Sequence, residues 1–203
     1  IFGAHPFAGI FVNIFLNLFS IILIYKIGEL LFSERVGFIA AVLFTLDLHH
    51  TIFIYYILTE TIYTTIFLAG LYYYIKGLKS NQLNYFFLVG IIYGISALVR
   101  PISQYYIAGI IVFTLLWYFK EWKKGLKFAV LIAFSYFIAI APWGMRNYIK
   151  YDHFALSNIK GYNFLFWNAS YYESKRLGQP IDTINAQFKT ELIKMGWRPD
   201  MNP

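Results

Sequence analysis

Long apolar runs separated by short polar loops fill most of this chain up to residue 141, and they constrain the fold more than any other feature. The runs cover residues 7–32, 36–48, 52–75, 85–99, 102–119 and 127–141. A helix needs about 20 apolar residues to cross a membrane, and in lipid every backbone polar group must be bonded within the protein. We therefore predict an all-α membrane protein, a polytopic bundle of about six transmembrane helices.

Composition agrees with a chain whose main solvent is lipid, since 59% of its residues are hydrophobic and only 13% are charged. A net charge of +7 would suggest a nucleic-acid partner in a soluble protein. Here the positive residues lie in short loops between apolar runs, where they set membrane orientation, so we predict no nucleic-acid partner. The chain has no cysteine, which excludes disulfides, thiolate catalysis and cysteine metal sites.

The distribution of positive charge predicts which ends of the helices face the cytoplasm. Loops 33–35, 76–79 and 120–127 carry Lys or Arg, and they alternate with segment 47–51, which carries neither. Because basic loops stay cytoplasmic, region 47–60, Arg100 and the chain after Pro142 are expected on the outer face of a multi-pass cell-membrane protein. We divide the chain into a transmembrane bundle, residues 1–147, and an incomplete extracytoplasmic segment, residues 148–203, with one expected helix at 183–195.

Glu60 is the strongest candidate for a functional residue, because its ionisable side chain lies inside an apolar run. An ionisable side chain at membrane depth costs about 2.5–3.5 kcal/mol on insertion scales and commonly marks a functional site. A carboxylate beside an apolar cavity can act as a general base or bind a metal. The competing interpretation is a residue near a helix N-terminus, paired with a tyrosine or with backbone. We interpret Glu60 as functional.

Further candidate residues reach the same face, and each has an ordinary alternative. Arg100 has a fork of donors that suits phosphate, but it can also be an arginine snorkelling to the interface. An acid and an arginine together suggest group transfer from a phosphorylated carrier, and a transporter or flippase remains the rival function. Trp143, Arg146 and Asn147 form a second candidate group, and the alternative for them is anchoring of a helix end at the membrane interface. Asp47, His49 and His50 form a third, and the alternative for them is an interfacial turn with a helix cap.

Three segments together resemble a known family. They are LTET at residues 58–61, GIIYGISALVRP at 90–101 and APWGMRNY at 141–148. In this order and spacing they resemble the bacterial membrane glycosyltransferases of the GT-C fold, related to protein O-mannosyltransferases and to the aminoarabinose transferase of lipid A. The resemblance implies an integral-membrane hexosyl- or pentosyltransferase. It would move a sugar, with inversion, from a polyprenyl-phosphate carrier to a hydroxyl of a protein, lipid or glycan on the extracytoplasmic face.

The resemblance also implies roles for individual residues. Its main catalytic base is an acidic residue of the first outer loop, which we expect outside this chain, because the chain begins at Ile1 without a Met and looks like an internal piece. Glu60 matches a second acidic position that positions the acceptor or contacts metal, and Arg100 and Arg146 match basic positions near the carrier phosphate. No cofactor is certain, and a divalent metal is left open. A catalytically inactive relative that serves as a scaffold is the third alternative.

Overall fold

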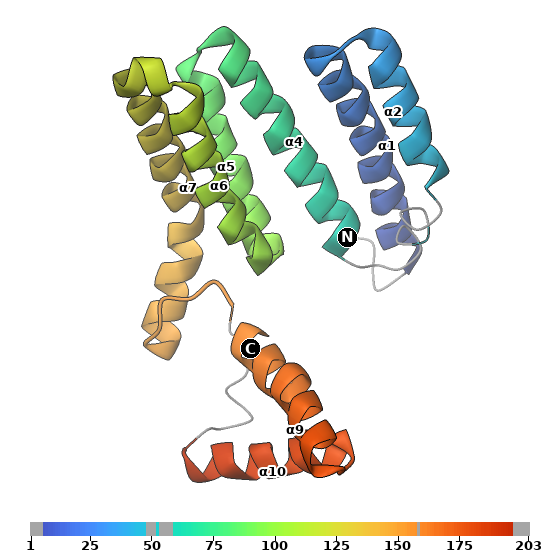
Figure 1. Ribbon diagram of the computed structural model, residues 1–203, viewed down its shortest axis with the longest axis vertical. Helices are drawn as coiled ribbons and strands as arrows, with labels where there is room; N and C mark the ends of the chain where they lie inside the picture. The colour runs from blue at the N-terminus through green and yellow to red at the C-terminus, as the bar shows by residue number, and fades with distance from the viewer. Residues whose placement is uncertain (1–5, 48–51, 53–58, 158, 197–203) are drawn as a thin grey trace.

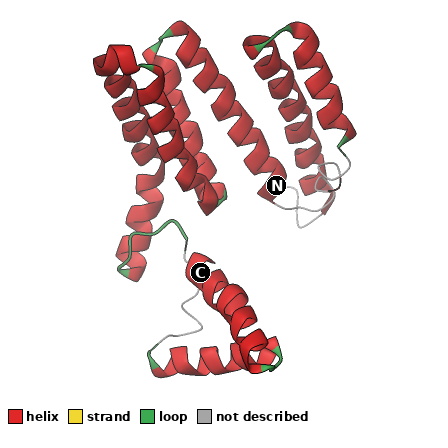
Figure 2. Ribbon diagram, viewed as in Figure 1, coloured by secondary structure: helices red, strands yellow, loops and turns green. Residues whose placement is uncertain are grey.

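The computed structural model describes residues 6–47, 52, 59–157 and 159–196, and the regular structure within these ranges is helical throughout (Figure 2). The predicted all-α class is therefore confirmed for the described part of the chain. The predicted helix at 183–195 is also present, as α10 (Ile181–Lys194).

Six helices of the bundle run up and down in chain order (Figure 1). The C-terminal end of α2, the N-terminal end of α4 and the C-terminal end of α5 all lie at one end of the bundle, and the basic loops lie at the other. This arrangement matches the alternation expected from the loop charges. The helices are α1 (Pro6–Leu31), α2 (Glu34–Leu46), α4 (Thr59–Ser80), α5 (Leu83–Val99), α6 (Gln104–Trp117) and α7 (Trp122–Tyr151).

Two segments of the described chain are long and apolar enough to cross a membrane by length and composition alone, Phe7–Leu31 and Phe119–Tyr151. Leu83–Val99 and Pro101–Trp117 are shorter apolar helices. The expected number of about six spanning helices therefore stays a prediction, although each predicted run contains a helix.

The helix in the last predicted run continues past the end of that run. α7 passes through Pro142 and ends at Tyr151, where Asp152 adopts φ 53° and its N–H bonds to the Tyr148 carbonyl. The helix therefore extends beyond the apolar run at 127–141 at both ends. A proline removes one helical hydrogen bond without ending a helix that tertiary contacts hold, so the apolar run understates the helix. The division at residue 147 stays a prediction, and α7 crosses it.

Glycines bring the central helices close together. A Cβ placed on Gly90 of α5 would lie 1.9 Å from Ser135 Oγ and 2.3 Å from the Ile132 carbonyl oxygen of α7. One on Gly94 would lie 2.5 Å from Ala139 Cβ. Small residues four apart let helix backbones approach closely in membranes. The spacing of small residues in segment 90–101 therefore serves helix packing.

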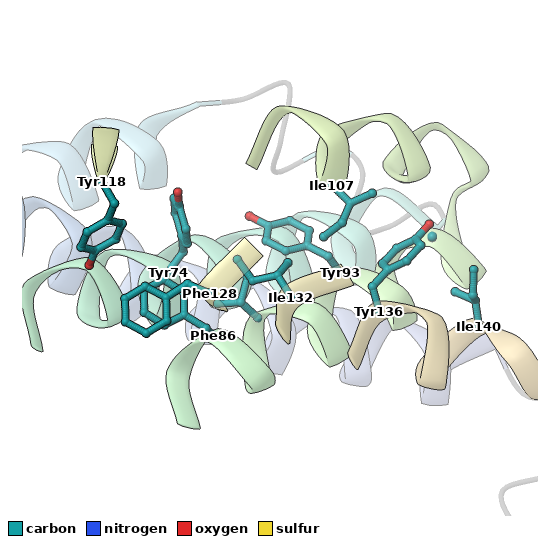
Figure 3. Close-up of a cluster of buried hydrophobic side chains, with 11 residues drawn as sticks. Tyr74, Phe86, Tyr93, Ile107, Tyr118, Phe128, Ile132, Tyr136 and Ile140 are labelled. Atoms are coloured by element: carbon teal, nitrogen blue, oxygen red, sulfur yellow. The ribbon is translucent and has the colours of Figure 1, made fainter. Parts of the chain in front are cut away.

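Around this contact lies a core to which α4, α5 and α7 contribute aromatic side chains and α6 contributes Ile107 (Figure 3). Phe86 and Phe128 stack with ring centroids 4.1 Å apart. The Tyr74 hydroxyl lies 2.7 Å from Thr114 Oγ1, which joins α4 to α6. Buried tyrosines need such partners because an unpaired hydroxyl in an apolar interior is costly.

The helices α1 and α2 form a pair that joins the bundle through α4. The Ser20 and Thr65 hydroxyls lie 2.8 Å apart, and Thr65 also donates to the Leu16 carbonyl at 3.1 Å. Hydrogen bonds of this kind hold helices together where lipid offers no hydrophobic contrast.

After α7, four short helical elements pack against one another: α8 (Ile159–Asn163), the π-helix η3 (Phe164–Ala169), α9 (Ser170–Leu177) and α10. Ile184 of α10 is 1% exposed and supplies their small apolar centre. The first three were not predicted, because this stretch has no apolar run to signal them.

Candidate functional site

An ion pair joins Glu60 to Arg100 at the predicted outer end of the bundle. The Arg100 Nη1 lies 3.0 Å from Glu60 Oε1, with 38% of the arginine and 31% of the glutamate side chain exposed. Glu60 lies in the first turn of α4, and Arg100 is the residue at which α5 ends. Glu60 therefore lies at a helix N-terminus, as the competing interpretation expects, and its ion-pair partner among the described residues is an arginine.

Arg100 ends α5 in an extended backbone conformation because Pro101 follows it. A residue before proline is pushed towards extended backbone, and Arg100 has φ −137° and ψ 116°. The short 3₁₀-helix η1 (Pro101–Ser103) then turns the chain into α6. A buried contact of 2.8 Å between the hydroxyls of Ser96 and Ser103 closes this corner. The Arg–Pro pair therefore ends α5, and the Arg100 side chain reaches back to Glu60 of α4.

Tyr63 also contacts Arg100, and sequence reasoning missed it. The Arg100 Cζ lies 5.6 Å from the centre of the Tyr63 ring. A cation over an aromatic face is attracted to the ring quadrupole. Tyr63 follows Glu60 by one helical turn, so the i, i+3 spacing on α4 could have identified it as a neighbour of any Glu60 partner.

A cavity of about 490 Å³ lies beside this corner. Pro101 and Gln104 line one side of it, Tyr136 and Ile140 of α7 another, and segment 154–157 a third. The Gln104 Nε2 is buried and has no hydrogen-bond partner among the described residues. Buried donors without a partner are rare, and one on a cavity wall is a natural donor to a ligand. The sequence did not identify Gln104 as a candidate, because it lies in an apolar run that predicts only a helix.

The third predicted group holds the wall of this cavity in place. The Trp143 Nε1 donates to the Leu156 carbonyl at 3.1 Å, and the Asn147 Nδ2 donates to the Ala155 carbonyl at 2.7 Å. Arg146 Nη1 donates to Asn147 Oδ1 at 3.0 Å, and its Cζ lies 4.6 Å from the Trp143 ring centre. The exposed Arg146 is thus oriented by two neighbours on α7, while Arg100 is oriented by a residue of α4.

The remaining predicted residues are less informative. Asp47 follows α2, and its backbone N–H bonds to the Phe44 carbonyl at 3.3 Å. His49 and His50 lie outside the described residues. Within the described ranges there is no group of three or more His, Cys, Asp or Glu side chains that could hold a metal ion. The question of a divalent metal therefore stays open.

The geometry suits binding of an anion better than proton abstraction by Glu60. One Glu60 oxygen already accepts from Arg100. A guanidinium carries five N–H donors, more than one carboxylate oxygen can accept, so the fork can still donate to an oxyanion. Arginine presents these donors in a fixed plane, which matches phosphate oxygens.

Comparison with known proteins gives one match. The family model described as dolichyl-phosphate-mannose-protein mannosyltransferase matches residues 1–145. This range contains Glu60, Arg100 and Trp143 and ends just before Arg146. Neither a curated protein nor a solved structure matches the chain.

Proposed function

This chain belongs to the dolichyl-phosphate-mannose-protein mannosyltransferase family, a family of membrane glycosyltransferases, and we propose that it transfers a sugar from a polyprenyl-phosphate carrier to a hydroxyl acceptor on the outer face of the membrane. The observation that carries the proposal is the Glu60–Arg100 pair. The Gln104 cavity lies at the same corner, since Pro101 lines it next to Arg100 in the chain. Donor, acceptor and face go beyond the family membership and rest on this geometry and on the loop charges.

In the proposed reaction, Arg100 binds the carrier phosphate. The bond between the anomeric carbon and the phosphate oxygen breaks, and the acceptor oxygen bonds to that carbon while losing its proton to a base. The released carrier phosphate gains negative charge in this step. A guanidinium already in place stabilises that charge without reorganisation, which is where electrostatic catalysis gains most.

Glu60 acts as a positioning residue in this proposal. Its carboxylate orients the Arg100 guanidinium, and it lies where an acceptor hydroxyl could also be held. The resemblance implies that the main base is an acidic residue of the first outer loop. Glu60 is therefore not assigned the proton transfer.

The Gln104 cavity, which Pro101 lines, has a size that suits the donor head group. Small-molecule sites commonly enclose about 300–1,000 Å³, and this one measures about 490 Å³. Its walls are mostly apolar, with the Gln104 amide as a donor. We propose that Gln104 donates to a phosphate or sugar oxygen, and that segment 154–157 closes the site from the outer side.

A transporter or flippase is the competing function, and one experiment separates the two. Full-length protein in membrane vesicles is given a radiolabelled polyprenyl-phosphate sugar, and loss of label from the carrier is measured for wild type and Glu60→Gln. The control is Glu29→Gln, which removes a carboxylate from an ion pair of 2.7 Å with Lys26 at the opposite end of the bundle.

We expect Glu60→Gln to lower transfer about tenfold or more, because a misoriented guanidinium loses part of its stabilisation of the transition state. Glu29→Gln should transfer like wild type, and both variants should reach the membrane in normal amounts. No label transfer from any carrier, with solute uptake by proteoliposomes instead, would favour the transporter.

A further inference from the structure

A second cavity lies in the C-terminal segment, apart from the Gln104 cavity in the sequence and in its lining. It measures about 830 Å³ and lies between η3 and α9 on one side and α10 on the other. The proposed reaction does not use it. We call it the C-terminal groove.

One wall of the groove is aromatic. Tyr162, Phe166, Trp167 and Tyr171 line it, and the Trp167 side chain is 71% exposed. The Tyr162 and Phe166 rings lie with their centroids 4.7 Å apart. Exposed aromatic side chains gathered in one hollow usually mark a binding site.

Two rings of the aromatic wall lie on a π-helix. Residues 164–169 form this π-helix, and its consecutive residues Phe166, Trp167 and Asn168 all line the groove. π-Helical turns are rare and occur frequently at functional sites. This is a second observation pointing to a ligand.

The opposite wall belongs to α10 and is mixed, because Ile181 lines it together with polar side chains. Asp182, Asn185, Ala186 and Lys189 follow the i, i+3, i+4, i+7 spacing of one helix face. Asn185 is held in place, because its Oδ1 accepts a 2.5 Å hydrogen bond from the fully buried Ser170 hydroxyl. The wall thus presents a carboxylate, an amide and an ammonium, with opposite charges that balance.

We propose that the C-terminal groove binds a saccharide chain of the acceptor. A sugar ring has an apolar face of C–H groups, which can pack on an aromatic ring, and an edge of hydroxyls, which need both donors and acceptors. The two walls supply these two surfaces. The balanced charge favours a neutral ligand, and among the described residues there is no strand edge along which an extended peptide could pair.

This inference rests on the proposed function only in identifying the ligand as the acceptor. Saccharide binding itself can be measured without transfer. The probes are neutral hexasaccharides of mannose, glucose and N-acetylglucosamine, titrated calorimetrically into full-length protein in lipid nanodiscs. A decapeptide rich in Ser and Thr is the comparison ligand.

The variants are Trp167→Ala and Trp167→Phe, with Trp122→Ala as the control. Trp122 is 62% exposed, like Trp167, but lies at the opposite end of the bundle. We expect Trp167→Ala to weaken binding of at least one hexasaccharide about tenfold, since loss of an aromatic contact worth roughly 1.4 kcal/mol has that effect. Trp167→Phe should keep most of the affinity, and Trp122→Ala should keep all of it.

The outcome can be separated from that of the transfer assay. Hexasaccharide binding is measured without donor and without transfer, so a failed transfer assay leaves this result intact. Glu29→Gln, which removes a carboxylate at the basic end of the bundle, should bind the hexasaccharide like wild type. Helix content by circular dichroism must match wild type in every variant. The proposal is overturned if no hexasaccharide binds the wild-type protein, or if the decapeptide alone binds and Trp167→Ala abolishes that binding.

Discussion

At the scale of the residue, the contact between Glu60 and Arg100 matters for orientation more than for stability. Both side chains are about one-third exposed. Ion pairs with that exposure stabilise a fold by about 0–1 kcal/mol. The contact fixes the direction of a guanidinium whose remaining donors can reach a ligand.

Substitutions of Arg100 should separate charge from shape. Arg100→Ala should weaken carrier binding more than Arg100→Lys, because an ammonium keeps the charge but only part of the donor fork. Competition by unlabelled polyprenyl phosphate in the transfer assay measures this binding. If both variants lose affinity equally, Arg100 acts through helix packing.

Gln104 offers a test in which stability and activity move in opposite directions. Gln104→Leu removes the buried Nε2 that has no described partner. Burying such a donor unpaired costs a fold about 1–3 kcal/mol of desolvation free energy, so its removal should stabilise the folded state. We expect the thermal unfolding temperature in detergent to hold or rise while sugar transfer falls. A lower unfolding temperature with normal transfer would make Gln104 a structural residue.

At the scale of the element, the contact of α5 with α7 positions the site. The Arg100 corner lies at the end of α5, and Trp143 and Asn147 lie near the end of α7. Gly90 and Gly94 set how closely these helices pack. A change in that spacing would shift the two walls of the Gln104 cavity relative to each other.

Adding a single methyl group at Gly90 tests this contact. Gly90→Ala should lower the thermal unfolding temperature, because overpacking a tight contact costs about 1–3 kcal/mol. Gly109→Ala is the control, since its Cβ would meet nothing within 4 Å and alanine is the better helix former. Similar unfolding temperatures for Gly90→Ala and wild type would show that α5 and α7 can move apart without loss.

At the scale of the whole molecule, the alternation of helix directions collects the site at one end. Glu60 and Arg100 come from different helices, and the antiparallel run of the bundle brings their ends together (Figure 1). The loops rich in Lys lie at the other end. From the positive-inside rule we predict that the site faces the outside of the cell.

The absence of native cysteine allows a direct test of that orientation. Lys120→Cys marks the basic end and Glu191→Cys marks α10, and both side chains are exposed. In intact cells a membrane-impermeant maleimide should label Glu191→Cys and spare Lys120→Cys until the cells are lysed. The reverse pattern would place the site in the cytoplasm.

Prediction of helix bounds from the sequence was accurate where the local apolar run alone sets them. The runs at 7–32 and 85–99 correspond to Pro6–Leu31 and Leu83–Val99, and α5 ends where Arg100 precedes Pro101. The apolar run at 127–141 is shorter than α7 (Trp122–Tyr151), in which Trp143 and Asn147 donate hydrogen bonds to segment 154–157. The candidate residues Glu60 and Arg100 were identified, but their contact, Tyr63 and Gln104 were not.

The sequence by itself determined the helical membrane class and the candidate residues expected at one end of the bundle. Apolar runs and loop charges are local features, and each contributes to helix formation and membrane burial independently of distant residues. Only the tertiary structure showed that Glu60 pairs with Arg100 and that the Gln104 amide lines a cavity. It also showed which aromatic rings line the C-terminal groove. Those contacts join residues on different helices or turns. Their distances depend on how closely the helices pack, which no local pattern encodes.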